Sequence, residues 1–269
     1  MRFDCVSKTY PDGTVAVRDF SLEVASHEVV VLLGSSGCGK TTLMRMVNRM
    51  VEPSSGSVLI DDEDIASADP VALRRSIGYV MQSGGLLPHR TIVDNVATVP
   101  LLLGEARAPA MQRAMDLLTT VGLDAEQVAG RYPSQLSGGQ RQRVGVARAL
   151  ASDPNILLMD EPFGAVDPVV RAELQTELLR LQRQLAKTIV FVTHDVDEAF
   201  TLGQRILVLR EGAQVVQEGT PADILLTPAD AFVAEFIGGS RRRLHIDQRD
   251  GRQVVLDADG RLAGVVATR

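Results

Sequence analysis

The chain has 269 residues, 45% of them hydrophobic, so it can bury a substantial core as one large domain with subdomains or an appendage. Residues 240–269 hold seven Arg and four Asp, which leaves 21 basic against 30 acidic residues in 1–239. The excess of acidic residues in 1–239 argues against a nucleic-acid partner, because non-specific nucleic-acid binding depends on neutralising phosphates with Lys and Arg. No apolar stretch approaches the ~18 residues that span a bilayer, and no signal peptide or disulfide framework is visible, so we expect a soluble intracellular protein.

Strand and helix patterns alternate along the chain. Residues 1 to about 27 and 56–80 have short strand-like patterns flanked by polar residues, which predict a small antiparallel sheet. Helical patterns alternate with four runs that are apolar throughout, so we expect an α/β fold with a mainly parallel core sheet and helices on both sides. Residues from about 88 to 135 show helical patterns without a buried strand and predict an inserted helical subdomain. The four apolar runs are 28–34, 155–162, 188–195 and 205–212.

The first buried run ends in "GSSGCGKTT", which matches the GxxxxGK[ST] phosphate loop between a strand and an amphipathic helix. Its glycines allow the backbone amides to point at phosphate oxygens, and the helix N-terminus adds positive potential. We expect Lys40 to contact the β and γ phosphates and the Thr41 hydroxyl to bind Mg²⁺; the alternative is a glycine-rich turn without a ligand. The predicted nucleotide-binding residues of this loop are Gly34, Ser35, Ser36, Gly37, Cys38, Gly39, Lys40, Thr41 and Thr42.

Polar residues follow the other predicted strands where a parallel sheet would bring them to one edge. Asp160 and Glu161, in "ILLMDEP", are placed to bind Mg²⁺ and to polarise the attacking water, although such a pair can also be a polar cap. His194, in "FVTHD", would end on the same edge, and we favour a contact with the γ-phosphate over a merely satisfied polar residue. Gln82, in "GYVMQ", is compatible with a site residue or with a surface amide.

A second glycine-rich segment, "QLSGGQRQRV" at residues 135–144, resembles another phosphate loop at a helix start, although the chain already has one. The motifs "GSSGCGKTT", Gln82, "LSGGQ", "LLMDEP", "AVD" and His194 together resemble, in order and spacing, the ATP-binding cassette (ABC) ATPases. The resemblance covers residues 1–238, which we predict to be one ABC domain with its helical subdomain at about 88–150.

The resemblance implies roles for individual residues and a head-to-tail dimer of two copies. Tyr10 corresponds to the aromatic residue that stacks on adenine, the alternative being a core or edge-strand tyrosine. Gln82 corresponds to the residue that connects Mg²⁺ and the attacking water to the helical subdomain. Asp167 corresponds to the loop that crosses to the partner, although "GAVD" departs from the commoner "SALD". The segment implied to close over the ATP that the other copy holds consists of Ser137, Gly138, Gly139 and Gln140.

Longer phrases such as "MDEPFGAVDPVVR" are similar to the ATPase subunits of bacterial importers for quaternary amines, such as glycine betaine, choline or carnitine. This resemblance implies a transmembrane permease subunit, an indirectly acting solute-binding protein and a peripheral location on the cytoplasmic face of the cell membrane. Leu86, Leu87 and Val99 look exposed and could form a groove for a short helix of the permease. The alternatives are import of another small solute, a soluble ABC ATPase without a transport role, and a nucleotide-gated module without turnover.

The pattern changes after Gly239. The stretch "VVLDADGRLAGVVATR" alternates like a hairpin that turns at residues 258–260. It is similar to the strand pair of the regulatory modules named for cystathionine β-synthase (CBS), and thirty residues are too few for one such module. We therefore interpret residues 239–269 as a short tail, either a remnant of a CBS-like module or a small hairpin on the cassette.

Overall fold

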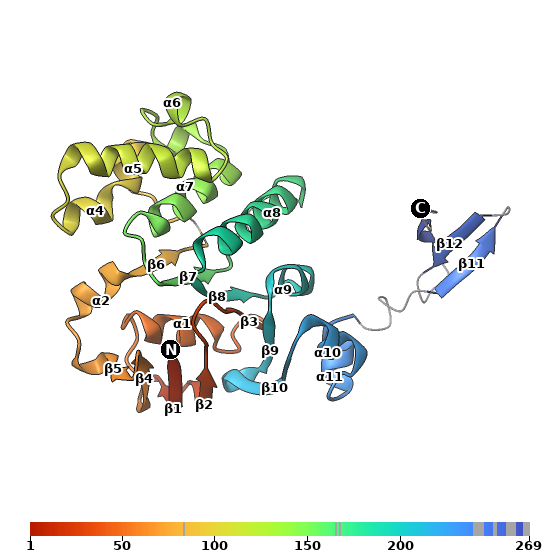
Figure 1. The fold of residues 1–269 in the computed structure, drawn as a ribbon. Coiled ribbons are helices and arrows are strands. Elements are labelled where there is room, and N and C mark those ends of the chain that lie inside the picture. The colour runs from red at the N-terminus through yellow and green to blue at the C-terminus, as the bar shows by residue number, and fades with distance from the viewer. Residues whose placement is uncertain are drawn as a thin grey trace.

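The computed structural model describes residues 1–82, 84–164, 166, 168–238, 245–249, 252–256 and 262–265 (Figure 1). Its strands are β1 (Arg2–Thr9), β2 (Val15–Glu23), β3 (Val29–Gly34), β4 (Ser55–Ile60), β5 (Glu63–Asp64), β6 (Ile77–Val80), β7 (Ile156–Asp160), β8 (Thr188–Thr193), β9 (Arg205–Arg210), β10 (Gln214–Gly219), β11 (His245–Arg249), β12 (Arg252–Leu256) and β13 (Leu262–Val265). Its α-helices are α1 (Lys40–Val47), α2 (Pro70–Ser76), α3 (Ile92–Val96), α4 (Thr98–Leu102), α5 (Arg107–Thr120), α6 (Ala125–Val128), α7 (Gly138–Leu150), α8 (Pro168–Leu185), α9 (Val196–Leu202), α10 (Pro221–Leu226) and α11 (Ala231–Phe236). The short 3-10 helices are η1 (Ile65–Ser67), η2 (Pro133–Gln135) and η3 (Glu211–Ala213).

The central sheet has the strand order β10-β9-β3-β8-β7-β6. Its strands are parallel except for β10, which pairs antiparallel with β9. Strands β3, β7 and β8 are buried along their whole length, which explains why their sequences are apolar throughout instead of alternating. The predicted α/β fold with a mainly parallel core is therefore confirmed, and the four apolar runs contain β3, β7, β8 and β9.

Successive residues of the central strands enter two different cores, one on each face of the sheet. Val31 and Leu33 of β3 pack into the core that contains residues of α5, α7, α8 and α9. Val30 and Leu32 pack into the core formed with α1 and with the antiparallel strands β1 and β2. Because both faces are covered, the polar side chains of β7 and β8 lie at the strand ends, and the carboxyl edge is available for a site.

The antiparallel sheet has the order β2-β1-β4-β5 and lies beside α1. The prediction for residues 56–80 was wrong in its second half, because α2 and β6 do not belong to this sheet. Asp69 caps α2 by accepting a hydrogen bond from the backbone amide of Ala72, and Pro70 occupies the first helical turn, so the chain starts a helix there. Strand β6 then joins the edge of the central sheet beside β7.

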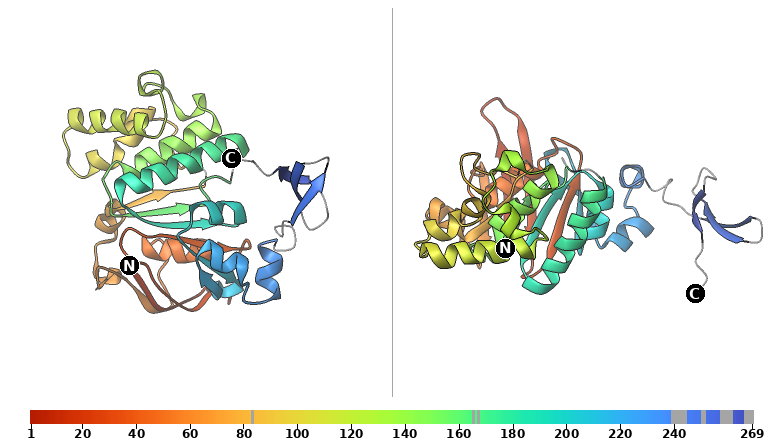
Figure 2. Two further views of the ribbon diagram at one scale, coloured as in Figure 1. Left: turned by 45° about the vertical axis from the view of Figure 1, so that its right-hand side comes forward. Right: turned by 90° about the horizontal axis from the view of Figure 1, so that it is seen from above.

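The described chain between β6 and β7 contains no strand. Its regular elements are the helices α3, α4, α5, α6 and α7 and the short helix η2. They gather at the top of the left view of Figure 2, coloured yellow to green. An inserted helical region is thus confirmed as part of the fold, whereas its boundaries at about 88 and 150 stay predictions.

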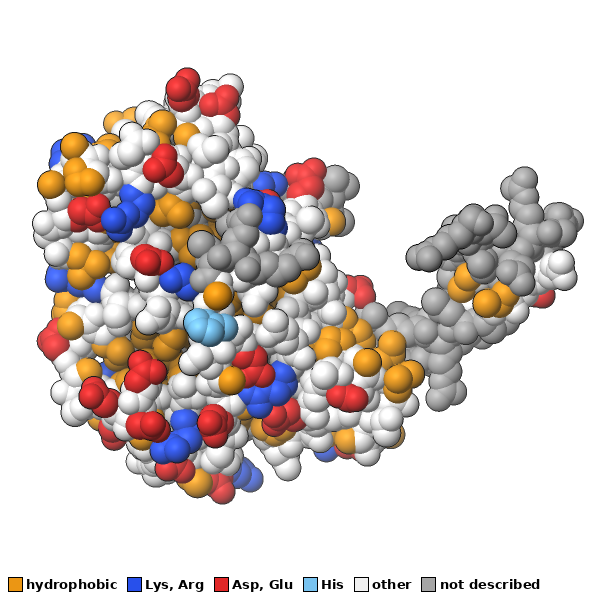
Figure 3. Space-filling model, in the orientation of Figure 1, with side chains coloured by type: hydrophobic (Ala, Val, Ile, Leu, Met, Phe, Trp, Pro, Cys, Tyr) orange, Lys and Arg blue, Asp and Glu red, His pale blue; other side chains and the backbone are white. Residues whose placement is uncertain are grey.

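Beyond α11, β11, β12 and β13 form a separate three-stranded antiparallel sheet. The pairing of Val254 with Val265 brings together the two halves of the predicted hairpin, whose turn lies outside the described residues. Its origin as a remnant of a CBS-like module stays a prediction. On the face drawn in Figure 3, apolar side chains gather over α10 and α11, where Leu226 is 79% exposed. Among the described residues, no helix combines the length and apolar character that a membrane crossing requires.

Candidate functional site

The phosphate loop connects the end of β3 to the start of α1, and its shape depends on glycine. Gly39 is the residue before α1 and has a φ of 111°, which favours glycine. A Cβ atom at Gly39 would lie 2.3 Å from the carbonyl oxygen of Ala16, and one at Gly34 would lie 2.6 Å from that of Leu209. The backbone of β2 and β9 therefore presses against the loop, leaving residues 35–37 exposed at its rim.

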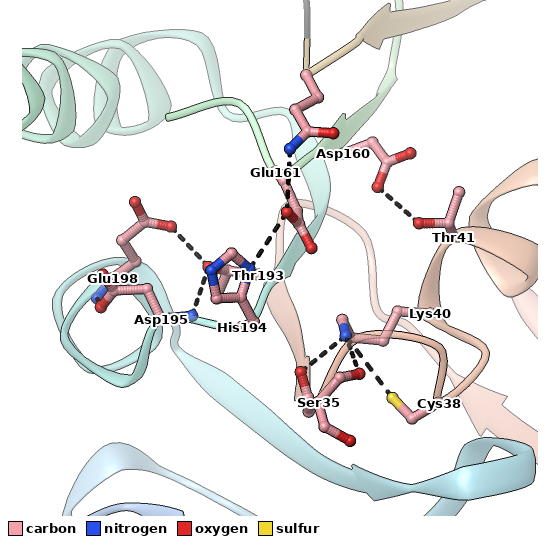
Figure 4. A network of polar contacts seen from close by, with 12 residues as sticks. Ser35, Cys38, Lys40, Thr41, Asp160, Glu161, Thr193, His194, Asp195 and Glu198 are labelled. Carbon is pink, nitrogen blue, oxygen red and sulfur yellow. Dashed lines mark hydrogen bonds and ion pairs between the residues drawn. The ribbon is translucent and has the colours of Figure 1, made fainter. Parts of the chain in front are cut away.

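Lys40 is held inside this loop. Its ammonium group donates hydrogen bonds to the carbonyl oxygens of Gly34 and Ser35, at 2.7 and 2.8 Å, and lies 3.7 Å from the sulfur of Cys38 (Figure 4). The residue is only 4% exposed. A cation that is buried and satisfied by carbonyl dipoles and a thiol sulfur, without a carboxylate, is suited to exchange them for an anionic ligand.

Asp160 ends β7 and faces the start of α1. Its Oδ1 atom accepts a hydrogen bond of 3.0 Å from the Thr41 hydroxyl (Figure 4), and its Oδ2 atom accepts one of 3.3 Å from the hydroxyl of Tyr79 on β6. Burial, together with the nearby Asp160 charge, raises the pKa of Tyr79 to about 12. Tyr79 was missed in the sequence, because only the pairing of β6 with β7 brings it to Asp160.

Glu161, Gln82 and His194 lie together at the neighbouring strand ends. The Glu161 Oε2 atom accepts a hydrogen bond of 3.3 Å from the Gln82 side-chain amide and lies 3.2 Å from His194 Nδ1 (Figure 4). Glu161 has a φ of 44°, an unfavourable backbone conformation for a residue with a side chain, and its amide is tied to the Val192 carbonyl of β8. The His194 side chain is 53% exposed, so a ligand can reach it.

The turn that carries His194 is braced by neighbouring polar residues. The Thr193 hydroxyl donates a 2.6 Å hydrogen bond to Glu198 and accepts one of 2.9 Å from the Asp195 amide (Figure 4). Burial raises the pKa of Glu198, which is opposed by its hydrogen bond from Thr193. Arg171 of α8 forms a 3.0 Å ion pair with Asp195 and donates to the carbonyl of Val166, so it joins this turn to the segment that follows Glu161. None of these supporting contacts was predicted.

Tyr10 lies half-buried at the turn between β1 and β2. Its backbone pairs with Thr14, and the Lys8 ammonium lies 5.4 Å from its ring centre. The following strand brings the carbonyl of Ala16 against Gly39, so this turn neighbours the phosphate loop.

The "LSGGQ" segment forms the start of α7. The Ser137 side chain accepts a hydrogen bond from the Gln140 amide, and the Gln140 side chain accepts one from the Ser137 amide, which completes a capping box. Ser137 is exposed and Gly139 is buried. Asp167, the predicted crossing residue, lies outside the described residues.

The oxygen atoms around Thr41 and Asp160 fit Mg²⁺ in the company of a nucleotide. Among the described residues, no group of three or more His, Cys, Asp or Glu side chains is arranged to hold a metal ion. Mg²⁺ commonly takes one or two protein oxygens and completes its shell with water and phosphate oxygens. The donor set beside the phosphate loop therefore suits a metal that arrives with phosphates.

Two curated proteins are similar in sequence to most of this chain. The chain is 55% identical over 236 residues to the choline transport ATP-binding protein OpuBA of Bacillus subtilis, covering 88% of this chain and 61% of that protein. It is 51% identical over 226 residues to the osmoprotectant import ATP-binding protein OsmV of Salmonella typhimurium, covering 84% and 59%. The chain thus spans about three fifths of the length of these curated relatives.

Solved structures resemble the same part of the chain. The dimeric bacterial ABC transporter cassette MJ0796 matches with a TM-score of 0.74 and 34% identity, over 82% of this chain and 98% of that chain. A dimeric post-hydrolysis state of the same ATP-binding cassette, bound to ADP and Pi, matches with a TM-score of 0.73, 34% identity and the same coverage. The family model described as ABC transporter matches residues 17–164. The chain therefore belongs to the ABC transporter family.

Proposed function

We propose that this chain is the ATP-binding and ATP-hydrolysing subunit of a membrane importer for quaternary amines such as glycine betaine, choline or carnitine. The solute class is supported by the names of relatives such as OpuBA and OsmV. The hydrolytic activity rests on one observation: the Glu161 carboxylate lies within 3.3 Å of both the Gln82 amide and the His194 imidazole, beside the phosphate loop.

Bound ATP with Mg²⁺ supplies the electrophilic γ-phosphoryl group. The backbone amides of residues 34–42 and the Lys40 ammonium bind the phosphate oxygens, with Lys40 exchanging its present carbonyl partners for them. The Thr41 hydroxyl, Asp160 and the Gln82 amide are the groups that would hold Mg²⁺. Tyr10 stacks on the adenine ring. These side chains bind and orient, which is most of what phosphoryl transfer requires of a protein.

Glu161 is the general base that accepts a proton from the attacking water. Its carboxylate is already aligned by Gln82, which orients the same water. His194 contacts the γ-phosphate from the neighbouring strand end, and its exposure permits that approach. The braced turn around Thr193 keeps the imidazole at the distance from Glu161 that this arrangement needs.

The complete site requires a second copy of the chain packed head to tail, as proposed from the resemblance. Ser137 is exposed at the start of α7, where the helix N-terminus and the amides of Gly138 and Gly139 favour an anion. In this arrangement "LSGGQ" closes over the ATP held by the partner's phosphate loop, which explains the presence of two loops in one chain. The dimeric state of the MJ0796 cassette supports this proposal.

The permease subunit is proposed to contact the helical region, with the cassette at the cytoplasmic face of the membrane and the solute-binding protein acting indirectly. Leu86, Leu87 and Val99 are half-buried, so they are less exposed than the sequence suggested. None of the three lines the cavity of about 480 Å³ in this region, which is bounded by Arg90, Arg107 and Leu102, and Leu102 is 54% exposed. A short amphipathic helix of the permease would fit such a partly apolar groove.

Phosphate release from the purified chain with ATP and Mg²⁺ tests the activity, and uptake of labelled choline or glycine betaine tests the solute class. Cells that lack other osmoprotectant importers would receive the gene for this chain together with its neighbouring permease and solute-binding genes. We expect hydrolysis, and uptake that Glu161→Gln abolishes. Hydrolysis without uptake of any quaternary amine would leave an ATPase for another small solute or a soluble ABC ATPase. Absence of hydrolysis with the permease present would refute the enzymatic proposal.

A further inference from the structure

Arg148 of α7 reaches from the helix that begins at "LSGGQ" to the loop that follows Gln82. Its Nη1 atom donates a hydrogen bond of 2.6 Å to the carbonyl oxygen of Gly85, and its Nη2 atom donates one of 3.1 Å to that of Gly84. The two carbonyls belong to adjacent residues, so the planar guanidinium binds both with its fork of donors. The arginine therefore fastens the Gln82 loop to α7 at two points.

The loop is shaped to lie against this helix. Gly84 and Gly85 have φ values of 72° and 58°, which favour glycine and turn successive carbonyls toward Arg148. A Cβ atom at Gly145 of α7 would lie 3.4 Å from the Gly84 carbonyl oxygen, so the helix backbone approaches the loop closely there. A Cβ atom at Gly85 would lie 2.5 Å from the sulfur of Met81. These glycines allow loop and helix to touch without intervening side chains.

The far end of the same loop is fastened to α3. Asn95 is fully buried; its Oδ1 atom accepts a 2.7 Å hydrogen bond from the Leu87 amide, and its Nδ2 atom donates to the Leu87 and Arg90 carbonyls. The loop is thus held at both ends by side chains of the helical region. A displacement of α7 must therefore move the chain that leads back to Gln82.

Arg148 is an unusual choice for a purely structural contact. Burial lowers the pKa of Arg148, and within the part of the chain that the structure describes no Asp or Glu forms an ion pair with it. Desolvating a cation without a carboxylate partner is costly, and an apolar residue would pack on a glycine-rich loop without that cost. The cation is needed where two carbonyl groups must be held in a fixed direction.

We propose that Arg148 is a positioning residue that couples the "LSGGQ" helix to Gln82. When α7 moves as the second copy's nucleotide is engaged, Arg148 carries the loop with it, and the Gln82 amide is brought to its place beside Glu161. The inference rests on the proposed function, since it gives Arg148 its effect through Gln82. It assigns to Arg148 no contact with nucleotide or with the attacking water.

The test uses the purified full chain with Arg148→Lys and Arg148→Met. Lys keeps the charge but cannot bind both carbonyls as a fork, so its effect should be intermediate. Arg143→Met is the matched control, because Arg143 lies on the same helix and donates a 3.0 Å hydrogen bond to the Val121 carbonyl, away from the Gln82 loop. We expect kcat for ATP hydrolysis to fall by roughly 10- to 100-fold in Arg148→Met, the range of effects for a misplaced positioning group, while KM stays unchanged.

Two readouts separate positioning from stability. Hydrogen–deuterium exchange of nucleotide-free protein should accelerate at residues 84–90 in both Arg148 variants and not in Arg143→Met. In the Gln82→Ala background, Arg148→Lys should cause little further loss of kcat, because residues acting through one another are not additive. If Arg148→Met does not fold, Arg148→Lys alone decides by these two measurements.

Equal exchange and equal kcat in Arg148→Lys and wild type would overturn the inference. A loss of kcat that adds fully to that of Gln82→Ala would also overturn it, because the effect would then not act through Gln82. Absence of hydrolysis by the wild-type chain with its permease would remove the proposed function and this inference with it. Hydrolysis by wild type with unaffected Arg148 variants would remove the inference alone.

Discussion

Replacing Glu161 with Gln is the most direct perturbation of the proposed chemistry. The substitution keeps the size of the side chain, and the Gln carbonyl oxygen can still accept the 3.3 Å hydrogen bond from Gln82. What it removes is the group that accepts a proton. General-base assistance is worth ~10² to 10⁴ in rate, and we therefore expect a barrier higher by about 2.7–5.4 kcal/mol at 1.36 kcal/mol per factor of ten.

The assay is single-turnover phosphate release, accompanied by ATP binding and the association state. Glu161→Gln should bind ATP with the affinity of wild type, release phosphate ~10² to 10⁴ times more slowly and accumulate as an ATP-bound dimer. Glu126→Gln is the control, since Glu126 is an exposed residue of α6 away from the site. Near wild-type phosphate release by Glu161→Gln would refute the base assignment, and equal losses in both variants would indicate a non-specific effect.

Four further predictions concern other parts of the site and its surroundings. Tyr10→Ala should weaken ATP binding by about 1–3 kcal/mol by calorimetry and Tyr10→Trp should retain it, whereas unchanged affinity with a lower melting temperature would indicate a structural tyrosine. Lys40→Ala and Ser137→Arg chains, inactive separately, should regain ATP-dependent closure when mixed, measured by energy transfer; no recovery would contradict a shared site. Leu102→Glu should leave basal hydrolysis intact, because Leu102 is 54% exposed, and abolish permease-coupled uptake; loss of both would show that the substitution disrupts the cassette itself and would contradict a role in docking. The pKa of Tyr79 is raised from 10.0 to about 12, so between these pH values the hydroxyl ionises in the unfolded chain before it ionises in the folded one. The contribution of the neutral Tyr79 hydroxyl to the free energy of unfolding is therefore lost as pH rises from 10.0 to about 12, and denaturant titration should detect this loss in wild type and not in Tyr79→Phe.

The sequence by itself determined the parts that depend on short-range pattern. The phosphate loop could be predicted because strand, glycine turn and helix are consecutive, and β3, β7, β8 and β9 because strands buried on both faces are apolar throughout. The meeting of Glu161 and His194 followed from one topological rule, that parallel strands bring their carboxyl ends to the same edge, whereas Gln82 was left open between a site residue and a surface amide. The roles of these residues came from the family resemblance and stay proposals.

Only the tertiary structure decided which side chains support that site. Tyr79 lies 81 residues from Asp160, and Arg148 lies 63 residues from Gly85, so no local pattern connects either pair. Strand β6 was misplaced for a related reason: in a strand of four residues, partner and burial are set by the neighbouring strand rather than by its own sequence. Helix α2 is different, because its start at Asp69 and Pro70 is a local signal that the sequence carries. Periodicity reports which face of an element is buried, whereas the direction of a hydroxyl or a guanidinium depends on the packed elements around it.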